Sequence, residues 1–230
     1  IGHFAMRGRV IVEDDAAFQT WLAQQPTFAQ TMARPAPDVA AGQSAYAVCA
    51  ACHGAQGEGN EAVHAPKLAG LNGWYIKRQL GNFKHGLRGA NPKDAAGQTM
   101  APMAATLPDD AAVDNVVAYI RTLPDKPAPV TLKGNSRDGE HRFVTCGACH
   151  GADAGGIQAT NAPRLRGMSD WYLATQLEHF RDGVRGGHPQ DAYGSQMALF
   201  AAMLRDNQSI HDLLAYIDTL PAAGATGTKK

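Results

Sequence analysis

The sequence predicts an all-α protein built from two tandem copies of one small helical domain. One residue pattern recurs after 97 positions without a gap, and apolar residues recur at helical spacing in both copies. Neither copy contains an alternating apolar and polar segment that would predict a strand. The matched pairs include Cys49 and Cys146, Trp74 and Trp171, Arg88 and Arg185, Tyr119 and Tyr216, and Pro124 and Pro221.

Each copy is expected to contain three helices. The first helix carries the cysteines. A middle helix is expected over residues 72–86 and 169–183, with their first residues, Asn72 and Ser169, as N-caps and glycines at the ends. The last helix follows from apolar residues at i, i+3, i+4, i+7 and i+10 in residues 113–123; the second copy repeats it, and a proline ends each.

Composition excludes several classes of protein. The 21 basic residues equal the 21 acidic ones, which argues against nucleic acid held by bulk charge. The sequence has no run of eighteen apolar residues and therefore predicts no membrane span. With 44% apolar residues the chain can form a core, and four cysteines are too few for a disulfide scaffold.

All four cysteines fall in two copies of one motif, Cys49-Ala50-Ala51-Cys52-His53 and Cys146-Gly147-Ala148-Cys149-His150. Cys-x-x-Cys-His is the attachment signature of c-type haem: two thiols one helical turn apart bind the vinyl groups, and the histidine ligates the iron. The motifs predict two covalently bound haem c groups. A zinc site with four thiolates would leave both histidines unexplained, and a thioredoxin-like redox pair would need a βαβ unit.

The repeat also indicates a second ligand for each iron. Among the methionines only Met100 and Met197 match each other at the 97-residue offset, and among the histidines only His53 and His150 do. A thioether suits haem iron, so Met100 and Met197 are the expected distal ligands. The alternatives are ordinary core methionines, or Met103 or a histidine as the ligand.

The halves resemble class I cytochrome c domains in the tandem arrangement of the dihaem cytochrome c4 family, over residues 38–221. This resemblance implies electron transfer without substrate chemistry, on the periplasmic side of the bacterial inner membrane. It also implies that the carbonyls of Pro66 and Pro163 accept the second imidazole N–H. Arg88 and Arg185 could pair with haem propionates, or could be surface residues.

The first 37 residues have no repeat partner and resemble the C-terminal end of subunit II of haem–copper cytochrome c oxidases. There, a binuclear copper site is followed by a strand and a Phe-x-x-Trp-Leu helix. His3 and Met6 match the last two copper ligands, but the cysteines and the earlier histidine are absent, so no copper is expected in this chain. The matching residues downstream are Val10, Ile11, Val12, Phe18, Trp21 and Leu22.

These resemblances give a domain prediction and a function. The divisions are residues 1–37, a strand-plus-helix remnant of a copper-binding, cupredoxin-like domain with its linker; 38–124 and 138–221, the cytochrome c domains; 125–137, a linker; and 222–230, a flexible tail. The predicted function is a dihaem electron-transfer module of oxidase subunit II. It would pass electrons from a periplasmic donor, a cytochrome c or bc1-type complex, to the copper domain and catalytic subunit I.

On this interpretation the full-length protein is tethered to the membrane, this stretch of it is soluble, and it has no small-molecule substrate. The alternatives are a free-standing dihaem carrier, the cytochrome subunit of a dehydrogenase, and a dihaem peroxidase with one open haem. The lysines near the first middle helix, expected mainly as solvated surface charge that could steer partners, are Lys67, Lys77, Lys84 and Lys93.

Overall fold

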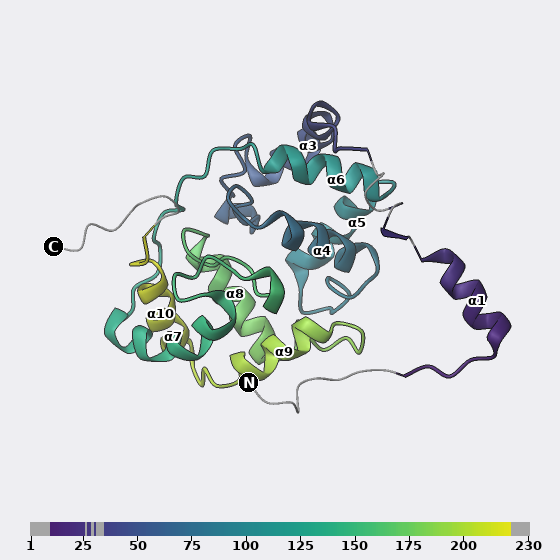
Figure 1. The fold of residues 1–230 in the computed structure, drawn as a ribbon. Coiled ribbons are helices and arrows are strands. Elements are labelled where there is room, and N and C mark those ends of the chain that lie inside the picture. The colour runs from purple at the N-terminus through teal and green to yellow at the C-terminus, as the bar shows by residue number, and fades with distance from the viewer. Residues whose placement is uncertain (1–9, 26, 29, 31–34, 222–230) are drawn as a thin grey trace. The chain divides into compact units, whose positions relative to one another are not determined.

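The computed structural model describes residues 10–25, 27, 28, 30 and 35–221 (Figure 1). The chain divides into two compact units, Ile1–Pro37 and Asp38–Lys230. In the first unit, helix α1 (Asp15–Gln24) begins where the Asp14 carboxylate accepts a hydrogen bond from the Ala17 amide. The helix expected for this segment is therefore present.

The strand predicted at Val10–Val12 is wrong. These three residues have no regular structure, and the described residues contain isolated bridges but no strand. A strand needs a partner for its backbone N–H and C=O groups, and no other extended segment pairs with this one in the described part of the unit. A remnant of a copper-binding domain is thus not recognisable here, and His3 and Met6 lie outside the described residues.

The second unit contains the repeat, and each half has the same order of elements. The predicted middle and last helices are confirmed, whereas a further helix that carries Met100 or Met197 was not predicted. The elements are α3 (Val39–His53), η2 (Glu61–Val63), α4 (Gly73–Lys84), α5 (Ala95–Ala105) and α6 (Asp110–Ile120), then α7 (Ser136–His150), η3 (Gln158–Thr160), α8 (Asp170–Arg181), α9 (Ala192–Ala201) and α10 (Asn207–Ile217).

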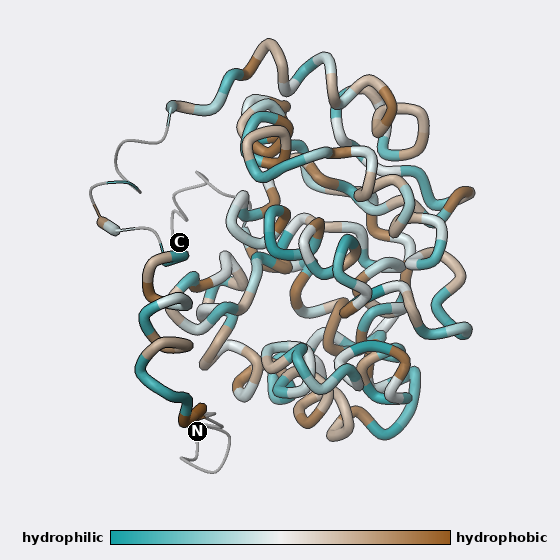
Figure 2. Tube along the Cα trace, turned by 90° about the vertical axis from the view of Figure 1, so that its right-hand side faces the viewer, coloured by the Kyte–Doolittle hydropathy of each residue, from teal (hydrophilic) through white to brown (hydrophobic). Residues whose placement is uncertain are grey.

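Each half has a core of its own. In the first, Tyr46 of α3 packs with Val116 and Ile120 of α6; in the second, Phe143 of α7 packs with Ile217 of α10. Figure 2 shows brown and teal stretches interleaved along the helices, as expected for helices that turn one face to a core. No helix in the described part of the chain combines the length and hydropathy needed to span a bilayer.

Glycines let the first and last helices of each half approach closely. A Cβ on Gly42 of α3 would overlap the carbonyl oxygen of Asn115 in α6, and one on Gly139 of α7 would overlap that of Asp212 in α10. Both glycines are buried, and the two helices can approach this closely only because glycine has no side chain.

Replacement of Gly42 by alanine should destabilise the protein, because the new methyl group must push α3 away from the α6 backbone. The expected loss is about 1–3 kcal/mol. It would be measured from the denaturant midpoint of the haem-loaded protein. Gly81→Ala in α4 is the control, since its Cβ would meet nothing within 4 Å. Equal stability of Gly42→Ala and the control would contradict the prediction.

Candidate functional site

Both cysteine motifs lie at the C-terminal ends of helices, in α3 and α7. Each helix ends at the motif histidine, and the next residue, Gly54 or Gly151, has a positive φ that turns the chain back. No disulfide joins any of the four cysteines, so both pairs are available for haem attachment. The described residues contain no cluster of three metal-ligating side chains, so the alternative of a four-thiolate zinc site has no support.

Both motif histidines are held by a proline carbonyl. His53 Nδ1 lies 2.8 Å from the carbonyl oxygen of Pro66, and His150 Nδ1 lies 2.7 Å from that of Pro163. Because a carbonyl can only accept, Nδ1 carries the proton and Nε2 is left for a metal. Burial lowers the pKa of both imidazoles, and each is 7% exposed, so the neutral form that ligates metal is favoured.

A short loop after each motif presents the proline. In the first half an isolated antiparallel bridge joins Asn60 and Ala65 around η2, and His64 takes a left-handed conformation. The second half repeats this arrangement around η3, with a bridge between Ile157 and Ala162. The bridge closes the loop immediately before the proline, which fixes the direction of its carbonyl.

The histidines and methionines line one continuous cavity of about 430 Å³ that extends through both halves. His53 and Met100 border it in the first half, and His150 and Met197 in the second. Apolar side chains such as Leu80, Phe83, Leu177 and Phe180 complete its walls. The helices α5 and α9 bring the methionines to it, and each begins at a buried aspartate that caps it, Asp94 or Asp191.

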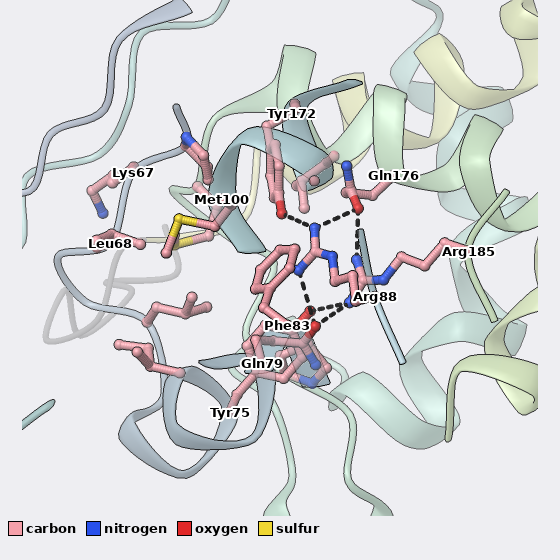
Figure 3. A pocket seen from close by; sticks show the side chains of 18 of the residues that line it. Lys67, Leu68, Tyr75, Gln79, Phe83, Arg88, Met100, Tyr172, Gln176 and Arg185 are labelled. Carbon is pink, nitrogen blue, oxygen red and sulfur yellow. Dashed lines mark hydrogen bonds between the residues drawn. The ribbon is translucent and has the colours of Figure 1, made fainter. Parts of the chain in front are cut away.

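Arg88 and Arg185 meet at the boundary between the halves, on the same cavity (Figure 3). The residues are 8% and 7% exposed, so they are not surface arginines. Each guanidinium bonds to both glutamines and to the tyrosine of the opposite half. The contacts are Arg88 with Gln79 (2.9 Å), Tyr172 (2.6 Å) and Gln176 (2.9 Å), and Arg185 with Gln176 (2.7 Å), Tyr75 (2.9 Å) and Gln79 (2.8 Å).

These side chains fit a haem c group in each half. The cavity is bordered by thiols of both motifs, by an imidazole with a free Nε2 and by a thioether, which is the donor set of a six-coordinate haem. All hydrogen-bond partners of the two buried guanidiniums are neutral, and Arg88 Nε is buried with no partner among the described residues. Two buried guanidiniums that have no ion-pair partner among the described residues, beside an apolar cavity, match the acid groups of haem.

A second polar cluster joins the halves through the linker. Lys67 and Arg164, which follow the two prolines, both pair with Asp125, the lysine at 2.8 Å. Lys67 is 2% exposed, so its interpretation as solvated surface charge is wrong. Two other lysines also have partners: Lys77 pairs with Asp114, and Lys84 donates to the Leu107 carbonyl. Burial of the first lysine follows from its place between two packed halves, which sequence periodicity does not record.

Sequence analysis did not select the tyrosines and glutamines at the boundary, or Asp125, as site residues. The available signal was the repeat itself, because Tyr75 and Gln79 recur as Tyr172 and Gln176, although polar residues in the middle of a helix usually face water. Asp125 has no such signal, since the matching position is Ala222.

Comparison with known proteins identifies the same family in both copies of the repeat. The family model described as Cytochrome c matches residues 39–124 and again 136–221. Cytochrome c4 of Azotobacter vinelandii is 31% identical over 202 residues, 82% of this chain and 92% of that protein. The thiosulfate dehydrogenase electron acceptor of Stutzerimonas stutzeri is 34% identical over 160 residues, 64% of this chain and 68% of that protein.

Solved structures of a cytochrome c4 and of a thiosulfate dehydrogenase are also similar to this chain. Reduced recombinant cytochrome c4 from Pseudomonas stutzeri matches with a TM-score of 0.62 and 28% identity, covering 81% of this chain and all of that one. Thiosulfate dehydrogenase (TsdBA) from Marichromatium purpuratum matches with a TM-score of 0.65 and 29% identity, over 82% of this chain and 41% of that one.

Replacement of Asp125 by asparagine should destabilise the protein by about 1–3 kcal/mol at neutral pH, because Lys67 and Arg164 lose their shared carboxylate while buried. Despite its partial burial, hydrogen bonds and charge from both cations hold the Asp125 pKa below its ordinary value of 3.8. Because the pKa of Asp125 is lower in the folded than in the unfolded state, its contribution to stability is present above the unfolded pKa and is lost as the pH falls through the folded pKa. The variant lacks this contribution and should therefore lose less stability on acidification below about pH 4.

The measurement is thermal unfolding of both proteins as a function of pH. Asp153→Asn is the control, since the side chain of Asp153 is 61% exposed and its pair with Arg166 is worth little. If Asp125→Asn matches the wild type in stability and in acid dependence, the shared carboxylate does not hold the halves together.

Proposed function

Because the chain belongs to the cytochrome c family and binds two covalently attached haem c groups of the cytochrome c4 type, we propose that it is a periplasmic dihaem electron carrier. The observation that carries the proposal is the single cavity that borders both histidines and both methionines. Two iron sites in one cavity allow an electron to enter at one half and leave at the other.

Each side chain has a role in this function. Cys49 and Cys52 hold the first haem by thioether bonds, and Cys146 and Cys149 hold the second. His53 and His150 would ligate the irons through Nε2, with Pro66 and Pro163 fixing the ring, and Met100 and Met197 would supply the second protein ligand of each iron. Arg88 and Arg185 bind the propionates. Bound haem supplies a one-electron ferric–ferrous couple; the protein's residues set its potential and exclude water.

A substrate-oxidising dehydrogenase is the proposed donor. This follows from the two relatives described as thiosulfate dehydrogenase electron acceptors, 34% and 35% identical to this chain, and from the structural match to part of a thiosulfate dehydrogenase. The oxidised protein should therefore be reduced by two electrons per chain when thiosulfate and thiosulfate dehydrogenase are both present. Stopped-flow absorbance would measure the rate. Reduction by thiosulfate without the enzyme, or none with it, would contradict this donor.

The oxidase module is the second candidate, favoured by one observation. Helix α1 carries Phe18, Trp21 and Leu22, the Phe-x-x-Trp-Leu pattern of the resemblance, and the ring centroids of Phe18 and Trp21 are 5.9 Å apart. The family model does not match this segment. Peptide mapping of the natural protein would decide: a Cys-x-x-x-Cys segment upstream of Ile1 with copurifying copper supports the oxidase module, and a cleaved secretory signal there supports the free carrier.

Met100→Ala should halve the far-red methionine–iron absorption band of the ferric protein, because one of two thioether ligands is removed. The potential of the first haem should fall at the same time, since a thioether raises it. Visible spectroscopy and a redox titration would measure both effects.

Met103→Ala is the matched control, since Met103 also borders the cavity but has Phe200 at the matching position of the second half. Loss of the band in the control and not in Met100→Ala would move the ligand to Met103. A high-spin ferric signal with peroxide turnover in the wild type would favour the peroxidase alternative.

A further inference from the structure

Each proline carbonyl that holds a histidine belongs to a peptide unit whose N–H group is bound by the opposite half. The peptide Pro163–Arg164 accepts from His150 through its carbonyl and donates its N–H to Asn72 Oδ1 at 2.6 Å. The peptide Pro66–Lys67 accepts from His53 and directs its N–H to Ser169 Oγ at 3.4 Å. The histidine of one half is thus joined to a side chain of the other through a single amide plane.

Asn72 and Ser169 are repeat equivalents at the N-cap positions of α4 and α8. Side chains at such positions ordinarily accept a hydrogen bond from their own helix. Neither does so here, so the sequence prediction gave the right position but the wrong bond. Both side chains reach instead to the peptide after the opposite proline, and Ser169 is 4% exposed.

The surroundings leave these peptides little freedom. A Cβ on Gly156 would lie 2.7 Å from Asn72 Oδ1, and one on Gly59 would lie 2.5 Å from the Lys67 nitrogen. Positive φ values at both glycines allow the close approach. The side chains of Lys67 and Arg164, which begin at the same two peptides, are fixed by Asp125.

We propose that Asn72 and Ser169 are positioning residues that tune the haem iron of the opposite half through the proline peptide; this rests on the proposed ligation by His53 and His150. An acceptor on the N–H polarises the amide and strengthens its carbonyl as an acceptor. A stronger bond from imidazole Nδ1 makes the ring a better donor to iron and stabilises the ferric state. The acceptor in one half therefore lowers the reduction potential of the other.

The two couplings are unequal. The contact of Asn72 is short, whereas that of Ser169 is longer than an ordinary hydrogen bond. The larger effect should therefore run from the first half to the iron of the second. A dihaem protein with otherwise matched halves would acquire different potentials by this route.

The test compares Asn72→Ala and Ser169→Ala in the haem-loaded full chain. Asn72→Ala should shift the potential of the second haem upward and leave the first unchanged, and Ser169→Ala should shift the first upward by less. Spectroelectrochemistry would measure both potentials, and the hyperfine-shifted proton NMR signals would identify each haem. Melting temperatures would show whether a variant is misfolded, and the milder serine variant tests the proposal if the asparagine variant does not fold.

Asn115→Ala is the matched control, because Asn115 Oδ1 also accepts from a backbone amide, that of Asp38 at 2.8 Å, but away from both histidine loops. It should leave both potentials unchanged. A shift confined to the mutated half, or no shift in either variant, would overturn the proposal. Failure of the proposed function would appear separately, in the wild type, as fewer than two low-spin haem signals.

Discussion

The bond between a buried imidazole and a proline carbonyl is the constraint around which each half is organised. His53 Nδ1 can be held at 2.8 Å from Pro66 only if α3 ends at the motif and the chain turns back at Gly54. The bridged loop around η2 then has to return the proline to the end of the helix. The second half meets the same requirement with the same elements, so its fold follows from one geometric need applied twice.

The boundary between the halves is polar, and this determines how it is stabilised. Buried guanidinium groups have a large desolvation cost, which neutral hydrogen-bond partners offset only in part. Arg88 and Arg185 also lie over the rings of Phe83 and Phe180, at 4.6 and 4.5 Å, which adds a cation–π contribution. The geometry of this interface is specific, and its stability depends on every hydrogen-bond partner, because each guanidinium binds residues of both halves.

The features that could be predicted from the sequence were those encoded by local patterns or by the internal repeat. Helical spacing predicted α6 and α10, N-cap residues and terminal glycines predicted α4 and α8, and the offset of 97 residues paired the histidines and the methionines. Helices α5 and α9 were missed because neither has an apolar stripe, and because a proline, Pro102, lies inside α5. Lys67 and Asn72 were misjudged for another reason. Lys67 pairs with Asp125 in the linker and Asn72 accepts from Arg164 in the other half, and no local pattern encodes a contact across more than fifty residues.

Asp125 breaks the symmetry that the duplication would otherwise have left. Lys67 and Arg164 are equivalent cations, yet one carboxylate serves both, and it lies in the segment that connects the halves. After the second copy the equivalent position is Ala222, which has no carboxylate. The two halves are therefore not interchangeable along the chain, because only the segment that follows the first half supplies the carboxylate that both cations share.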